Sequence, residues 1–255
     1  VKVFDEEATL RFSGDYHVYY PKEESFFSHN EREFLYLPLN EISETAIASL
    51  PAVVNTNDGV KVIVAESDVD DYPGLWLRGH RNNSLSATFP HFPTKEELKG
   101  DRDLRVTNTA EYIAVTKGQR TFPWRIIGVA ENDADILTSQ LVYLLAMPSQ
   151  ITDTTWIKPG KVAWDWYNAN NIYGVNFKSG INTETYKYYI DFASKHRIEY
   201  VILDEGWYKL GNLLEVVPEM NIETLVNYGK RKNVGIILWV VWKTLDDQFE
   251  PAFNQ

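Results

Sequence analysis

Carboxylates and tryptophans stand together at the ends of three short apolar runs in the second half of the chain. The three run ends are Trp164-Asp165-Trp166, Asp204-Glu205-Gly206-Trp207 and Trp239-Val240-Val241-Trp242. An indole face packs against the C–H bonds of a sugar ring, while a carboxylate binds hydroxyl groups or acts on a glycosidic bond. If the fold gathers these residues in one place, they predict a carbohydrate site.

The apolar runs have the spacing of parallel strands joined by helices. They begin at Val162, Val201 and Gly235, which are 39 and 34 residues apart, a usual separation for successive βα units. Asn182 and Asn221 are suited to cap the intervening helices, whose apolar residues recur at helical spacing. An eight-unit barrel needs about 250 residues, whereas 94 remain from the first strand onward. Either the barrel is incomplete in this sequence, or the fold is smaller.

A (β/α) barrel builds its site at the carboxyl ends of its strands. We therefore expect Trp164, Asp165, Glu205 and Trp242 to line one cavity there. Asp204 and Glu205 are neighbours, so on a strand their side chains point to opposite faces and only one faces the barrel axis. The alternative for each acid is a structural role, as a helix cap or as the partner of a lysine or arginine.

The first 150 residues have the pattern of antiparallel strands packed as a sandwich. Short alternating segments are separated by turn signals such as Asn57-Asp58-Gly59 and Lys117-Gly118. The expected strands are Ala8–Phe12, His17–Tyr20, Gly59–Ala65, Leu75–Leu77, Tyr112–Thr116 and Trp124–Val129. The predicted organisation is a β-sandwich over residues 1–152, a linker over 153–160 and an incomplete barrel over 161–255.

Composition excludes several classes of function. A formal net charge of −11 argues against nucleic acid or an anionic membrane as a partner. No apolar run has the length of a membrane span. Cysteine is absent, and the five histidines show no i, i+4 pair that would suit zinc. Neither a dinucleotide-binding nor a Walker glycine loop occurs, and no Gly-x-Ser-x-Gly elbow is present.

Longer motifs resemble glycoside hydrolase family 97 over nearly the whole chain. They are Ser25–Arg32, Ala65–Gly74, Trp156–Trp166, Ile202–Trp207 and Leu238–Gln248. The resemblance implies an N-terminal β-super-sandwich, a catalytic (β/α)8 barrel and a small C-terminal β domain. It also implies a calcium-dependent, exo-acting α-glycosidase, often periplasmic in gut Bacteroidetes. We expect a periplasmic protein; no signal peptide is visible, and the first residue is Val1, so the natural start is expected upstream.

The family has an inverting, α-glucosidase-like branch and a retaining, α-galactosidase-like branch. In the inverting branch the glutamate of the Glu-Gly-Trp motif is a base, and the following strand carries histidines and an acid. Here Leu238–Trp242 has neither, so the chain resembles the retaining branch. Its nucleophile and acid/base follow later strands, which places both after Gln255 together with the missing barrel half. The resemblance thus implies no catalytic residue within the chain, and the fragment alone should be inactive.

By resemblance, Glu205 then binds a substrate hydroxyl or acts electrostatically. The predicted substrate-binding residues, for an oligosaccharide or other α-glycoside, are Trp164, Asp165, Trp166, Asp204, Glu205, Trp207, Trp242 and Lys243. Glu66 matches a sandwich glutamate that binds Ca²⁺ in this family, and carboxylate oxygens suit that hard cation. Two alternatives stay open: an inverting α-glucosidase of the same family, and a non-catalytic carbohydrate-binding β-sandwich.

Overall fold

The computed structural model describes residues 1–254, and the chain divides into two compact units. Unit 1 comprises Val1–Glu97 and Arg105–Gln150, and unit 2 comprises Leu98–Leu104 and Ile151–Gln255. The short segment Leu98–Leu104 therefore groups with the second unit, whereas the predicted N-terminal domain was continuous over residues 1–152.

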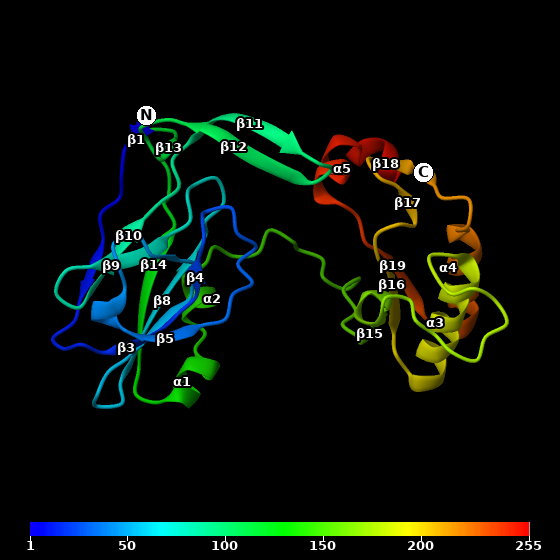
Figure 1. Ribbon diagram of the computed structural model, residues 1–255, viewed down its shortest axis with the longest axis horizontal. Coiled ribbons are helices and arrows are strands. Elements are labelled where there is room, and N and C mark those ends of the chain that lie inside the picture. Colours follow the sequence, from blue (N-terminus) through cyan, green and yellow to red (C-terminus); the bar gives the residue numbers. More distant parts are fainter. Residues whose placement is uncertain (255) are drawn as a thin grey trace. The chain divides into compact units, whose positions relative to one another are not determined.

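Unit 1 is built on two five-stranded sheets, whose strands pair in antiparallel fashion (Figure 1). The first sheet has the order β2 (Thr9–Arg11), β10 (Ser84–Thr88), β9 (Trp76–His80), β6 (Ile47–Ala48) and β4 (Lys22–Glu23). The second has the order β14 (Trp124–Ala130), β8 (Lys61–Ser67), β7 (Ala52–Asn55), β3 (His17–Tyr20) and β5 (Leu35–Pro38). The predicted antiparallel β fold of this region is confirmed.

Apolar side chains from both sheets form one core. Val18 and Val54 enter it from the second sheet, and Leu77 and Leu85 enter it from the first. Tyr20 is fully buried, but its hydroxyl donates to the carbonyl oxygens of Ala46 and Leu77, at 2.7 and 3.0 Å. Burial therefore leaves that hydroxyl with partners, as a stable core requires.

The remaining elements of unit 1 are short. They are β1 (Lys2–Val3) paired with β13 (Ala114–Val115), the one-turn 3₁₀ helix η1 (Leu39–Glu41), α1 (Asp133–Thr138) and α2 (Leu141–Leu145). A two-stranded ribbon of β11 (Pro93–Lys99) and β12 (Asp103–Thr109) is divided between the units, because its turn segment Leu98–Leu104 belongs to unit 2. All but one of its strand residues are exposed, and neither strand was among those predicted from the sequence.

Unit 2 contains a three-stranded parallel sheet with two crossover helices. Its strands are β15 (Val162–Trp164), β16 (Tyr200–Leu203) and β19 (Gly235–Leu238), hydrogen-bonded in that order. The helices are α3 (Thr183–His196) and α4 (Ile222–Lys232), which contact β16 and β19 respectively and lie side by side in Figure 1. Two βα repeats are thus present; closure into a barrel would need further strands.

Local sequence explains where these helices begin. The side chains of Asn182 and Asn221 accept hydrogen bonds from the backbone N–H groups of Thr185 and Thr224, at 2.9 and 2.8 Å. Each bond satisfies one of the amides that a helix N-terminus leaves without a partner. The two caps confirm the predicted helix starts.

The smaller elements of unit 2 correct one predicted strand. They are the 3₁₀ helix η2 (Asp165–Asn168), the hairpin β17 (Tyr208–Lys209) with β18 (Asn212–Val216), α5 (Trp242–Asp247) and α6 (Phe249–Phe253). The apolar run from Gly235 was expected to stay extended as far as Trp242. Instead β19 ends at Leu238, and Trp242 is the first residue of α5.

Candidate functional site

The site begins with a hydrogen bond between the ends of two neighbouring strands. β15 ends at Trp164, which pairs in parallel register with Ile202 of β16, so the residues after each strand meet at the same edge. There the indole nitrogen of Trp164 donates to Oδ2 of Asp204 at 2.6 Å. A hydrogen bond to a carboxylate is stronger than one between neutral groups, so it fixes the plane of the indole ring.

The turn after β16 is tightly determined. Oδ1 of Asp204 accepts the backbone N–H of Glu205 at 2.6 Å. Gly206 then has φ +110°, a conformation that L side chains rarely adopt, and a Cβ there would lie 2.3 Å from Cδ1 of Ile181. Glycine is therefore required at this position, and the turn holds Asp204 and Glu205 in fixed places.

The carboxylate of Glu205 lies at the surface, with 35% of its side chain exposed. Its Oε2 is 2.8 Å from Nη1 of Arg102, a residue of the segment Leu98–Leu104 that belongs to unit 2. The same guanidinium lies over the ring of Trp239, with Cζ 5.9 Å from the ring centroid. An anionic, accessible oxygen beside an indole is the chemistry that recognises a sugar hydroxyl.

Trp239 was not among the predicted site residues, although it stands at the end of the third apolar run. Its backbone N–H donates to the carbonyl of Leu203 at 3.0 Å, and its own carbonyl accepts the indole N–H of Trp207 at 2.8 Å. These bonds continue the edge of the sheet past β19. The third apolar run therefore did indicate a tryptophan at the site. Whether that tryptophan is Trp239 or Trp242 depends on where the strand ends, and β19 ends at Leu238.

Further aromatic rings stand next to Trp164. Trp166 and Tyr167 belong to η2, and their ring centroids lie 5.8 and 5.5 Å from that of Trp164. Trp166 is 65% exposed and Tyr167 77%. The predicted residue Trp166 thus presents a ring to solvent beside the hydrogen-bonded pair of Trp164 and Asp204.

Two predicted substrate-binding residues are buried instead. Asp165 is 2% exposed, and its Oδ2 accepts the hydroxyl of Tyr186 in α3 at 2.6 Å. Trp207 is 6% exposed and packs in the core of unit 2. For Asp165 the reason is strand alternation: the residue after Trp164 points to the opposite face, toward the helix. The expectation that Asp165 lines the cavity with Trp164 is therefore wrong.

Burial changes the acidity of Asp165. Its Oδ1 has no hydrogen-bond partner within the part of the chain that the structure describes. Desolvation raises the pKa of the Asp165 carboxyl; the hydrogen bond from Tyr186 acts in the opposite direction, and the charge of Asp204 adds to the rise. Asp165 is thus a buried acid, and its hydrogen bond with Tyr186 joins the end of β15 to α3.

The last two predicted residues lie in α5. Trp242 is 69% exposed, and Lys243 forms an ion pair with Asp247 one turn further along the helix. The hydrogen bonds, ion pairs and ring contacts within residues 1–254 join Trp164, Asp204, Glu205 and Trp239. They do not extend to Trp242 and Lys243.

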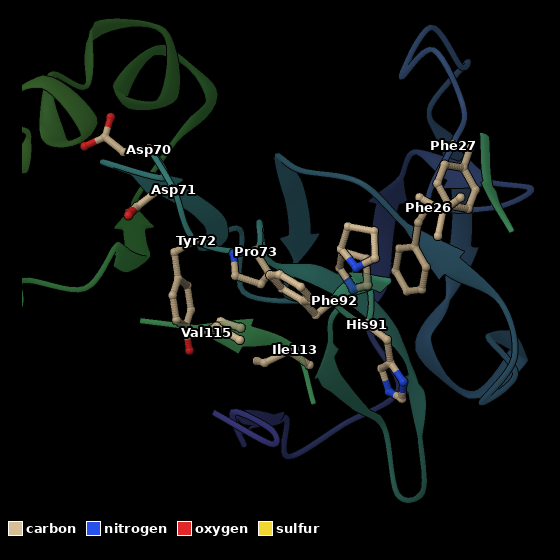
Figure 2. Close-up of a pocket in the computed structure, with 14 residues that line it drawn as sticks. Phe26, Phe27, Asp70, Asp71, Tyr72, Pro73, His91, Phe92, Ile113 and Val115 are labelled. Atoms are coloured by element: carbon tan, nitrogen blue, oxygen red, sulfur yellow. The ribbon is translucent and has the colours of Figure 1, made fainter. Parts of the chain in front are cut away.

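Unit 1 has a hollow of its own, which Figure 2 shows. It has a volume of about 390 Å³, and the rings of Phe26, Phe27 and Phe92 line it. The side chains of Asp70 and Asp71 point away from these rings in Figure 2, and Asp71 is paired with Arg120 at 2.7 Å. Because neither of these two carboxylates points toward the rings, this hollow lacks the pairing of an aromatic ring with an accessible carboxylate that is found in unit 2.

Glu66, the predicted calcium ligand, lies in β8 of unit 1. Its Oε2 accepts hydrogen bonds from Nη1 of Arg125 at 2.5 Å and from the N–H of Leu75 at 2.8 Å. Arg125 also binds Glu6 at 2.8 Å. Burial raises the pKa of Glu66, and the contacts with Leu75 and Arg125 act against that rise.

A calcium ion needs several oxygen ligands. No group of three or more histidine, aspartate or glutamate side chains suited to a metal occurs among residues 1–254. Within this part of the chain Glu66 does not belong to a ready-made group of metal ligands, and it shares the guanidinium of Arg125 with Glu6. These residues do not by themselves make a calcium site, and the metal stays a prediction. The described residues also include no helix with the length and apolarity needed to cross a membrane.

Comparison with known proteins gives the same assignment for both units. The sequence model of the glycosyl-hydrolase 97 N-terminal domain matches residues 1–148, and that of glycoside hydrolase 97 matches residues 165–255. A retaining alpha-galactosidase of Bacteroides thetaiotaomicron is 44% identical over 230 residues, which are 88% of this chain and 35% of that protein. A probable retaining alpha-galactosidase of Streptomyces bingchenggensis is 31% identical over 134 residues, 51% of this chain and 20% of that protein.

Solved structures agree at the level of the fold. A glycoside hydrolase family 97 enzyme from Pseudoalteromonas sp. strain K8, in complex with acarbose, superimposes with a TM-score of 0.77 at 22% identity, over 97% of this chain and 37% of that one. A beta-arabinopyranosidase gives a TM-score of 0.64 at 22% identity, over 91% of this chain and 35% of that one. The chain thus spans about a third of the length of the Bacteroides alpha-galactosidase and of the Pseudoalteromonas enzyme.

Proposed function

Since the chain belongs to glycoside hydrolase family 97, we propose that the complete protein is a retaining, exo-acting α-glycosidase of the α-galactosidase type. The similarity to the retaining alpha-galactosidase of Bacteroides thetaiotaomicron, at 44% identity, supports this branch over the inverting one. The observation that carries the proposal is the strand-end group of Trp164, Asp204 and Glu205, which joins an oriented indole to an accessible carboxylate.

Each of these residues has a distinct part in binding the sugar. The indole of Trp164 packs against the C–H face of the pyranose ring. Asp204 uses both oxygens on protein donors, so it orients Trp164 and the turn rather than the substrate. Glu205 offers a carboxylate oxygen to a sugar hydroxyl, and such a bond favours catalysis to the extent that it strengthens in the transition state.

Bond cleavage with retention needs two carboxyl groups about 5 Å apart, one as nucleophile and one as acid/base. Within this proposal, both belong to parts of the complete protein outside the 255 residues, in a closed (β/α)8 barrel. The 35% coverage of the curated relative supports this placement. Calcium held in part by Glu66 and location in the periplasm rest on the resemblance alone and stay predictions.

The stereochemical course of hydrolysis tests the proposal. The complete protein should hydrolyse an aryl α-galactoside faster than the matching α-glucoside, and proton NMR should detect α-galactose as the first product. First appearance of the β anomer would assign the protein to the inverting reaction. Preference for the α-glucoside would favour the α-glucosidase alternative, and the absence of hydrolysis of both substrates would favour a carbohydrate-binding protein.

A further inference from the structure

An exposed ribbon supplies the arginine that contacts Glu205. The strands β11 and β12 bury almost none of their side chains, and an isolated two-stranded ribbon is at best marginally stable. Its turn nevertheless makes specific contacts, because Leu98–Leu104 groups with unit 2. The ribbon is therefore built to present its turn residues rather than to enlarge a core.

Arg102 is the residue that the turn presents. Its Nε and Nη2 atoms donate to the two oxygens of Asp101, at 3.2 and 2.7 Å, which fixes the plane of the guanidinium. Its third nitrogen, Nη1, lies 2.8 Å from Oε2 of Glu205, and Trp239 lies beneath the group. One planar cation thus joins two carboxylates and an indole, a geometry that the rigid fork of arginine allows and lysine does not.

We propose that Arg102 is a positioning residue, which holds the carboxylate of Glu205 in the orientation that binds a substrate hydroxyl. Oε2 of Glu205 is occupied by the guanidinium, and Oε1 accepts no hydrogen bond from the residues that the structure describes, so it is left to the substrate. The inference rests on the proposed function, because it assigns Arg102 to the same site.

A contribution to folding stability does not explain the ion pair between Arg102 and Glu205. Both side chains are exposed to a third or more of their surface, and exposed ion pairs contribute little to folding. The pair can instead increase the affinity for substrate. Ordering a flexible side chain on binding reduces affinity, and Arg102 orders the side chain of Glu205 before the sugar binds. Loss of Arg102 should therefore weaken substrate binding while it leaves the fold intact.

A double-mutant cycle in the complete protein separates positioning from direct binding. The variants are Arg102→Gln, Glu205→Gln and both together, with Arg105→Gln as the matched control from an exposed position of the same ribbon. With an aryl α-galactoside, we expect Arg102→Gln to raise KM about tenfold, to change kcat less and to leave Tm within about 1 °C. In the Glu205→Gln background the same change should have no further effect.

Two results would overturn the inference. Independent, additive effects of Arg102→Gln and Glu205→Gln would mean that Arg102 does not act through Glu205. An equal effect of Arg105→Gln would reduce both arginines to general electrostatics. A wild-type protein that hydrolyses no α-glycoside would instead overturn the proposed function, and this inference with it.

Discussion

The indole nitrogen of Trp164 donates to Asp204 across 2.6 Å, so a single hydrogen bond connects the ends of β15 and β16. Asp204 also receives the N–H of Glu205. One carboxylate therefore sets the orientation of the indole ring that we propose packs against the sugar, and it also fixes the start of the turn that carries Glu205. Trp164 and Glu205 are coupled through this residue, although no hydrogen bond or ring contact among residues 1–254 joins them directly.

Asp204→Ala should lower kcat/KM for an aryl α-galactoside at least tenfold, because it releases two hydrogen bonds to a charged group, each worth about 1.5–3 kcal/mol. Asp204→Asn keeps an acceptor but loses the charge, so its kcat/KM should fall between those of Asp204→Ala and wild type. Steady-state kinetics of the complete protein measure the effect. A value within twofold of wild type for Asp204→Ala would contradict the coupling.

Glu205→Gln should lower kcat/KM at least tenfold, or about 1.4 kcal/mol of transition-state stabilisation. The amide keeps the shape of the side chain but lacks the anionic oxygen that strengthens a bond to a hydroxyl. Glu215→Gln is the matched control, because Glu215 is an exposed glutamate of the same unit that pairs with Lys209. Equal kinetics of the two variants would give Glu205 a structural role only.

Asp165→Asn should change the pH dependence of stability. The folded protein raises the pKa of Asp165 through burial, so its stabilising contribution is complete below the usual aspartate pKa of about 4 and is lost as pH rises through the folded value. Asparagine cannot ionise. The Tm of Asp165→Asn minus that of wild type should therefore be more positive at pH 8 than at pH 4, as calorimetry can measure.

Asp153→Asn is the control for that measurement. Hydrogen bonds from Thr155 lower the pKa of Asp153, so its contribution is present above the usual aspartate pKa and is lost as pH falls. The difference in Tm for Asp153→Asn should be small and of the opposite sign. A pH-independent difference for Asp165→Asn would show that Asp165 has an ordinary acidity in the folded protein.

Calcium removal tests the prediction for Glu66. Chelation of the complete protein should lower activity and Tm together, and Glu66→Ala should abolish most of this response. The control is Glu6→Ala, which removes the other carboxylate from Arg125 but leaves Glu66 in place. If Glu66→Ala still loses activity and Tm on chelation as wild type does, Glu66 serves only as the partner of Arg125.

Local signals in the sequence predicted the helices and the parallel strands well. Asn182 and Asn221 act within three residues of their own position, and the apolar runs at Val162 and Gly235 have the composition of buried strands. The prediction for Asp165 was wrong for a local reason, because consecutive residues at the end of a strand point to opposite faces and Trp164 and Asp165 cannot both face the substrate side. A shift of one residue along a strand moves a side chain from the face toward the proposed substrate to the face toward the helix.

The contact between Arg102 and Glu205 could not be predicted in this way. Pro93–Lys99 has a single large apolar side chain, Leu98, and is exposed on both faces, so it lacks the alternation by which strands are recognised. Nothing local in Asp101-Arg102 indicates a partner so far along the chain. Interactions of this kind are determined by the fold as a whole and leave no local signal in the sequence.

The exposed ribbon also sets an expectation for heating. Its hydrogen bonds have little buried surface behind them, so the strands β11 and β12 should open at a much lower free energy than the sandwich sheets. Their amide protons should exchange rapidly, and Arg102 should leave Glu205 while both cores remain folded. Activity should then decline several degrees below the temperature at which tryptophan fluorescence reports unfolding. The highest temperature at which the complete protein keeps its proposed activity would be limited by its least protected segment rather than by its core.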